Sequence, residues 1–289
     1  MRFSRIIGSV VSAVMFLTAC NPIAALKSTP ATATQPVKIT GTFSYSNDFV
    51  LETYYVEQAV ALADMHGFVI RDQEWVTPVE SQVLGYMNVD YDNNKGTFSI
   101  SLPVLPEGVF NDVDNNNQAD KGVQIFAASY WPNLAGGPYS EGDDPSFGWP
   151  GYLASIKTDS ENQNEVTGGM LVIWSPDDQQ QFPTGFGADG LLFTQDDPVG
   201  KIPAGYSVID LDQKPFKIIR DAEPELTLYE PADLEVKDFS ADTYLDSFNK
   251  MFAIVEKEYA FSNIPGKSPD WKALKAEIEP MVQKAQDDK

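Results

Sequence analysis

The 289-residue chain has a single cysteine and a single histidine. One cysteine excludes a disulfide framework within the chain and a zinc site built from cysteines. One histidine excludes a multi-histidine metal centre. Basic residues are also scarce, because 20 lysines and arginines face 42 acidic residues, for a formal charge of −22. Phosphate binding needs a basic surface, so we expect no nucleic-acid partner.

Familiar nucleophile and phosphate-binding motifs are absent too. The sequence contains no G-x-S-x-G, P-loop or G-x-G-x-x-G pattern, so we assign no catalytic residue. What the chain does have is 43% apolar and 12% aromatic residues. That content is too high for a disordered acidic chain. Its length fits one large domain with a smaller piece, at roughly 100–200 residues per domain.

The first twenty residues are typical of an exported lipoprotein. Arg2 and Arg5 precede a short apolar run, Ile6 to Phe16, and the segment closes with Leu17-Thr-Ala-Cys20. The run is too short to span a membrane, which takes about 20 apolar residues. The ending resembles the bacterial lipobox, whose cysteine becomes the lipidated first residue. We therefore predict a signal peptide over 1–19, lipidation at Cys20 and anchoring on the extracytoplasmic side; the alternative is an ordinary signal with a chance cysteine.

A tether and a large β domain are expected next. Residues 20–37 are rich in Ala, Thr and Pro, and this composition is typical of an extended tether. Residues 38–230 alternate short β-branched and aromatic runs with turn residues, which predicts an acidic, mainly β domain, an antiparallel β-sandwich or jelly-roll-like fold. The expected strands are Ile39–Tyr45, Val56–Ala63, Phe68–Arg71, Gln82–Tyr91, Gly96–Leu102, Val123–Tyr130, Tyr152–Lys157, Glu165–Trp174, Tyr206–Leu211, Phe216–Ile219 and Leu226–Tyr229.

Two of these assignments depend on local detail. The residues from Asp92 to Gly96 form a plausible hairpin loop, because Asn and Gly tolerate left-handed backbone angles. The segment from Gln58 to Asp64 has the propensity of a helical turn as well as a strand. We assign it as a strand because it is short and follows Tyr54-Tyr55-Val56.

Acidic side chains gather at spacings that suit calcium. Calcium takes six to eight oxygen ligands, and an alternating D-x-D-x-N loop supplies several from one turn. We therefore predict structural calcium, shared between clusters that meet at one end of the domain. The alternative is a set of solvated Asx turns. The candidate ligands are Asp112, Asp114, Asn116, Gln118 and Asp120 in the first cluster, and Asp189, Asp196 and Asp197 in the second; Asp90, Asp92 and Asn94 form a weaker third.

Aromatic side chains gather around Trp131, Trp149 and Tyr152. If they are exposed, they form a stacking platform for a sugar ligand. If they are buried, they belong to the core, since Trp and Tyr bury large areas. A surface lipoprotein with a glycan-binding sandwich is therefore an alternative function, and a purely structural envelope lipoprotein is another. His66, next to Gly67, is more typical of an incidental turn histidine than of a catalytic one.

The last fifty residues change character. Apolar residues from Tyr244 to Tyr259 follow helical spacing, and Ser240 offers an N-cap. Ser268-Pro269 predicts the start of a second helix, and Pro280 should kink or restart it. The segment 240–289 is therefore expected to form a helical hairpin.

The helical segment resembles the region that precedes the protease core in bacterial S41 serine peptidases, the tail-specific or C-terminal-processing group with tricorn-like relatives. The matching residues are Phe248, Met251, Phe252, Glu258-Tyr259-Ala260-Phe261, Asp270-Trp271, Leu274 and Pro280. The Asp-rich β region resembles the corresponding part of some lipoprotein members more loosely.

This resemblance implies a role without catalysis. S41 enzymes act through a serine nucleophile, with a lysine base or a His-containing tetrad, in a domain downstream of the matching segment. No position in this chain inherits that role. We therefore expect the chain to be the membrane-anchored N-terminal part of such a peptidase, with the protease core C-terminal to it as partner. The alternative is that the helices fold back on the β domain.

Overall fold

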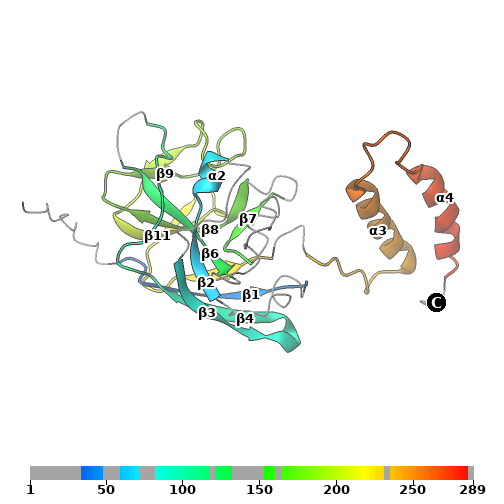
Figure 1. Cartoon of the computed structure of the whole chain (residues 1–289), viewed down its shortest axis with the longest axis horizontal. Coiled ribbons are helices and arrows are strands. Elements are labelled where there is room, and N and C mark those ends of the chain that lie inside the picture. The colour runs from blue at the N-terminus through cyan, green and yellow to red at the C-terminus, as the bar shows by residue number, and fades with distance from the viewer. Residues whose placement is uncertain are drawn as a thin grey trace, which may run out of the picture.

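The computed structural model describes residues 34–47, 59–71, 82–116, 121–131, 153–159, 165–230 and 235–285. Figure 1 shows a large curled sheet and, clear of it, two helices side by side at the C-terminal end of the described chain. The prediction of a mainly β domain followed by a helical hairpin is confirmed.

One mixed sheet holds eleven of the strands, and its hydrogen-bonded path runs β12-β11-β8-β6-β2-β3-β4-β1-β13. Strand β5 pairs with β6 and β7 with β8. Among the described strands, every pairing is antiparallel except that of β1 with β13. The strands of this sheet are β1 (Lys38–Ser44), β2 (Ala59–Asp64), β3 (Gln82–Asp90), β4 (Lys95–Ser101), β5 (Phe110–Asn111), β6 (Val123–Trp131), β7 (Ile156–Thr158), β8 (Val166–Ser175), β11 (Gly205–Asp210), β12 (Lys217–Ile219) and β13 (Glu225–Leu228).

Strand β2, in the middle of the sheet, is buried on both faces, whereas β4 and β13 alternate buried and more exposed residues. The six residues of β2 are all buried. Val60 and Leu62 point into one hydrophobic cluster, whereas Ala59, Ala61 and Ala63 point into the other. A strand buried on both faces has no polar alternation, because period-two side chains are apolar on each side. The strand assignment of this segment over a helical turn is therefore correct.

The short segment after β2 corrects one strand prediction. Phe68–Arg71 was expected to be a strand, but helix α2 (His66–Ile70) occupies this segment. The Asp64 carboxylate accepts a hydrogen bond from the His66 backbone N–H at 2.8 Å, which turns the chain as β2 ends. Arg71 then closes the turn in the left-handed region, with φ of 52°. The apolar run was too short for its periodicity to distinguish a strand from a helical turn.

A separate two-stranded sheet, β9 (Gln181–Pro183) with β10 (Val199–Lys201), was not expected from the sequence. Each strand has three residues, too few to give a periodic signal. The pair matters because it brackets residues 184–198, which include the second acidic cluster.

The helical hairpin consists of α3 (Tyr244–Glu258) and α4 (Trp271–Val282). Thr243 caps α3, with its side chain accepting from the Asp246 N–H. The expected cap at Ser240 is therefore wrong, since the chain reaches helical geometry only after Thr243. Within the described part of the chain, neither helix combines the length and the apolar character needed to span a membrane.

Helix α4 also begins later than expected. Its cap is Asp270, whose carboxylate accepts from the Ala273 N–H, in place of Ser268. A carboxylate at this position also interacts favourably with the helix dipole. Pro280 was expected to kink or restart the helix, but it lies within α4, in the last turn before Val282.

Candidate metal-binding loops

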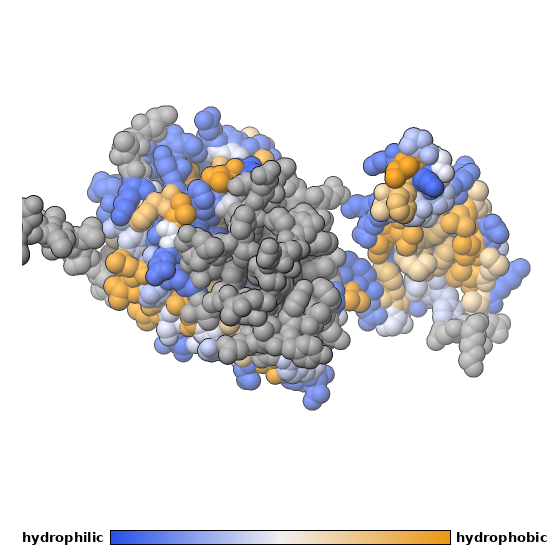
Figure 2. Space-filling view, viewed as in Figure 1, coloured by the Kyte–Doolittle hydropathy of each residue, from blue (hydrophilic) through white to orange (hydrophobic). Residues whose placement is uncertain are grey.

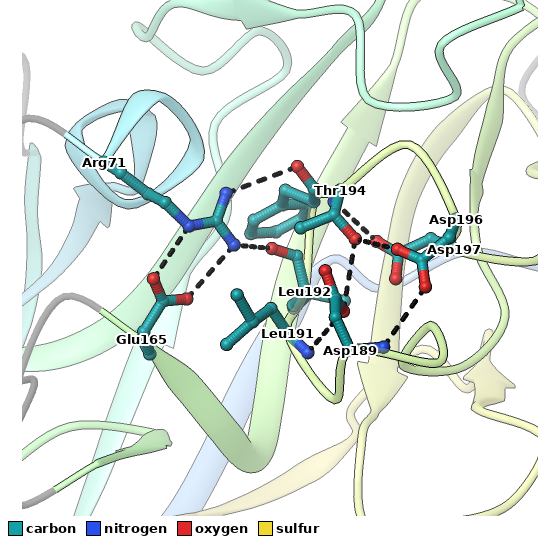
Figure 3. Close-up of polar contacts among 9 residues, drawn as sticks. Arg71, Glu165, Asp189, Leu191, Leu192, Thr194, Asp196 and Asp197 are labelled. Carbon is teal, nitrogen blue, oxygen red and sulfur yellow. Dashed lines mark hydrogen bonds and ion pairs between the residues drawn. The ribbon is translucent and has the colours of Figure 1, made fainter.

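The second acidic cluster lies in the loop between β9 and β10. Gly190 has φ of 76° and Phe193 has φ of 64°, so this loop turns twice through the left-handed region. Glycine adopts that region without strain, whereas for Phe193 surrounding contacts must hold it there. The carboxylates of Asp196 and Asp197 accept hydrogen bonds from backbone N–H groups on either side of Phe193, among them those of Asp189 and Thr194 (Figure 3).

Asp196 organises the exposed side of the loop. One of its oxygens accepts from the backbone N–H groups of Ala188 at 2.6 Å and Asp189 at 3.2 Å. The other accepts from the Thr194 hydroxyl at 2.7 Å. The Thr194 bond, together with the backbone N–H groups, stabilises the carboxylate and lowers the pKa of Asp196.

Asp197 accepts hydrogen bonds on the buried side of the same loop. Its two oxygens accept from the N–H groups of Gly187 at 2.8 Å and Thr194 at 3.0 Å. Only 8% of the residue is exposed. Burial raises the pKa of Asp197 in spite of these hydrogen bonds, because the ionised form is costly to desolvate. The loop therefore pushes the pKa values of two adjacent carboxyl groups in opposite directions.

Asp114 is the central hydrogen-bond acceptor of the first acidic cluster. Its oxygens accept from the Asn116 backbone N–H at 3.1 Å and from the Asn116 side-chain amide at 2.7 Å. Asn115 adopts φ of 49°, and its amide lies 3.4 Å from the Thr194 carbonyl oxygen, to which it donates. The tertiary structure therefore brings the first and second clusters together through Asn115 and Thr194.

The remaining candidate ligands of the first cluster are placed only in part. Asp112 is exposed just after β5, while Gln118 and Asp120 lie outside the described residues. The third cluster forms the β3–β4 turn, where the Asp90 carboxylate accepts from the Asn93 amide at 2.8 Å. Asn94 there has φ of 48°, as the predicted hairpin loop requires.

An arginine that the sequence analysis did not single out holds the second cluster in place. Arg71 forms a two-point ion pair with Glu165, at 2.7 and 3.1 Å. The same guanidinium donates to the carbonyl oxygens of Leu192 at 2.6 Å and Phe193 at 3.4 Å (Figure 3). Arg71 thereby ties α2, the start of β8 and the acidic loop together. Its partners lie 94 to 122 residues away, a separation that no local sequence pattern reports.

The carboxylates of the candidate ligands Asp114, Asp189, Asp196 and Asp197 already accept hydrogen bonds from their own loops. This arrangement closes the turns without a cation, as Asx turns do. Among the described residues, no three His, Cys, Asp or Glu side chains are grouped closely enough to hold a metal ion. A calcium site here would need oxygens from Gln118, Asp120 or backbone carbonyls in addition to Asp114 and Asp196.

A separate polar cluster, away from the acidic loops, surrounds His66. The Asp64 carboxylate accepts from the backbone N–H groups of His66 and Val109, at 2.8 and 2.6 Å. The Asn111 amide nitrogen donates to the Val109 carbonyl, so its oxygen faces His66 Nδ1 at 2.6 Å. His66 thus joins the end of β2 to β5, which gives the incidental histidine of the sequence analysis a structural role.

Several candidate residues cannot be placed. The lipidation residue Cys20 lies outside the described residues, as do Trp149 and Tyr152 of the aromatic platform. Trp131 ends strand β6, but its side chain is not among those described. Comparison of the chain with protein-family models, with curated proteins and with solved structures finds no match.

Proposed function

We propose that this chain is the membrane-anchored, non-catalytic N-terminal part of an S41-type serine peptidase. A lipid on Cys20 holds it on the extracytoplasmic side, and the β domain positions or gates the protease core. The observation that supports this proposal is the way in which the residues of the S41 resemblance divide between the inside and the outside of the helical hairpin.

Four of the resemblance residues make the internal contacts of the hairpin. The Phe252 and Tyr259 rings both lie edge to face with the Trp271 ring, at centroid distances of 5.8 and 5.3 Å. Phe248 lies 5.4 Å from Phe252. Aromatic pairs pack favourably at these separations. The motif therefore corresponds to one structural unit, in which α3 and α4 are held together by the residues that define it.

Other residues of the same hairpin leave apolar surface open to solvent. Figure 2 shows apolar surface along the two helices. Extended exposed apolar surface marks interaction sites in soluble proteins. In our proposal the protease core covers this surface. The exposed apolar residues are Met251, Val255, Phe261, Ile264 and Met281, each 45–61% exposed.

Calcium belongs to the same proposal as a structural ion of the β domain. Its support is the contact between Asn115 and Thr194, which brings together two acidic loops that lie far apart in the sequence. A cation there would offset repulsion between Asp114 and the Asp196–Asp197 pair. It would fix the loops and take no part in bond cleavage.

Two measurements test the peptidase proposal. The purified mature chain should not hydrolyse casein or peptide substrates, and hydrolysis above a heat-denatured control would contradict the assignment as non-catalytic. The DNA after codon 289 should continue in frame into a core with a Ser/Lys or Ser/His catalytic pair. A stop codon with no such core encoded nearby would remove the basis for the S41 assignment.

A further inference from the structure

The loop that follows β4 exposes large apolar side chains. Val104 is 92% exposed and Leu105 is 60% exposed. The segment 101–106, with the sequence SLPVLP, carries no charge, in a chain with 42 acidic and 20 basic residues. Exposed apolar residues that stand singly need no explanation, but two adjacent ones at the tip of an uncharged loop are a candidate contact site.

This loop lies at the end of the sheet where the N-terminal segment enters. Lys38 of β1 pairs with Ser101 of β4, so the start of one strand lies beside the end of the other. The Leu102 N–H donates to the Val37 carbonyl at 2.9 Å, and Val37 is itself 57% exposed. Figure 2 shows apolar surface on the β domain near the start of the described chain.

The β3–β4 turn lies at the opposite end of the same strands. Ser44 of β1 pairs with Lys95 of β4, and the Tyr45 N–H donates to the Asn94 carbonyl at 3.0 Å. At about 3.3 Å per residue, the length of β1 separates the two ends by roughly 20 Å. Tyr91 on this turn is 47% exposed, so it provides an apolar reference position far from the entry end.

We propose that the loop 102–106, together with Val37, contacts the surface of the lipid bilayer when the protein is anchored. This inference rests on the lipid anchor at Cys20 in the proposed function. The first described residue, 34, lies only 14 positions after Cys20. Linkers of that length span about 20 Å on average, so in our proposal the entry end stays close to the membrane. There, the uncharged side chains of Val104 and Leu105 leave water, which is favourable.

The test uses the mature chain coupled through Cys20, its only thiol, to a maleimide lipid in phosphatidylcholine vesicles. A photo-cross-linking benzoyl-phenylalanine replaces Val104 in one sample and Tyr91 in the control. We expect roughly tenfold more lipid adduct from position 104, in line with the transfer of one large apolar side chain out of water. Equal lipid adducts at the two positions, or adducts at 104 to a second copy of the protein, would overturn the proposal.

A second measurement does not alter the probe site. With the cross-linker at position 37, the double variant Val104→Asp/Leu105→Asp should lose most of the lipid adduct. The matched variant Tyr91→Asp should keep it. All three positions are exposed, so equal melting temperatures are expected and verify folding. An adduct that the loop variant leaves unchanged would also overturn the proposal.

A negative result in the vesicle experiment can be distinguished from a wrong prediction of lipidation at Cys20. The vesicle experiment couples the lipid chemically, so its outcome does not depend on how the cell processes Cys20. Mass spectrometry of the exported protein tests that processing separately, because acylated Cys20 gives an N-terminal peptide with added fatty-acid mass.

Discussion

The β domain and the helical hairpin differ in how many of their residues are buried. The sheet packs against two hydrophobic clusters, and its central strand β2 has no exposed residue. The hairpin buries only Phe248 and Phe252 among its described helical residues. Charge differs as well: residues 240–289 hold seven lysines and nine acidic residues, a net charge of −2, so residues 1–239 carry −20 of the total of −22.

This contrast indicates two different sources of stability. The β domain can offset its acidic repulsion with two large hydrophobic clusters and with the partly buried ion pair between Arg71 and Glu165. The hairpin, with two helices of 15 and 12 residues, has little core of its own. Short helices gain most of their stability from packing, so the hairpin depends on a few aromatic contacts and on whatever covers its apolar surface. Four predictions test this comparison.

The largest effect is expected for Phe252→Ala. Phe252 contacts both Phe248 and Trp271, and truncation of a buried Phe costs about 3–5 kcal/mol, more than so small a unit can absorb. The hairpin should lose its helical circular dichroism while the melting temperature of the β domain stays unchanged. Met251→Ala, at a position 48% exposed, is the control and should retain the helices. A shift of the β-domain melt in the Phe252 variant would show that the two regions are coupled.

A smaller loss is expected for Arg71→Met, this time in the β domain. The Glu165 carboxylate, in a side chain only 12% exposed, would lose its ion pair, and two loop carbonyls would lose their donor. We expect the free energy of unfolding, measured with urea, to fall by about 2–3 kcal/mol. Lys38→Met breaks the exposed pair with Glu223 and should cost less than about 0.5 kcal/mol. Equal effects of the two variants would contradict the structural role of Arg71.

Calcium should act on the β domain alone. Removal with EGTA is expected to lower its melting temperature by about 2–4 °C, because an ion bound with millimolar affinity adds only about 1–2 kcal/mol. The double variant Asp114→Asn/Asp196→Asn should melt at the same temperature with and without calcium. The helical hairpin serves as an internal reference. An unchanged melt of the unmodified protein would leave the acidic loops as Asx turns without a cation.

The smallest expected effect is a difference between Asp196 and Asp197 in how their contributions to stability depend on pH. The pKa of Asp197 is raised above 3.8, so its contribution to stability is complete below 3.8 and is lost as pH rises through the raised value. The pKa of Asp196 is lowered, so its contribution is present above 3.8 and is lost as pH falls through the lowered value. Relative to Asp197→Asn, the unmodified protein should therefore gain stability on acidification from about pH 6 to about pH 3; relative to Asp196→Asn, it should lose it. Urea midpoints that change in parallel for both variants would contradict this assignment.

The sequence predicted most long strands and both C-terminal helices because each carries its own period. Strands β3, β4, β6 and β8 begin and end within one residue of the expected positions. Short elements such as α2, β9 and β10 were misassigned or missed, because three to five residues show no usable period. Helix caps were displaced by two or three residues, since several polar residues could serve at each end.

The candidate site was predictable in composition but not in geometry. The alternation of Asp and Asn at 112–116 and the Gly-rich turn at 187–190 marked both acidic loops correctly as turns. Their contact through Asn115 and Thr194 spans 79 residues, and the Arg71 clamp spans more. Such contacts depend on which strands become neighbours, which a single sequence does not report.

The sequence by itself determined the two-part organisation, because hydrophobic periodicity, turn residues and charge are local properties. It also determined where carboxylates are concentrated and where apolar residues recur at helical spacing. Only the tertiary structure decided that Asp196 and Asp197 face different environments, that Arg71 secures their loop, and that the apolar residues Val104 and Leu105 lie at the entry end of the sheet. The physical reason is that burial and ion pairing depend on strand order and register, which are set by long-range packing of the whole chain.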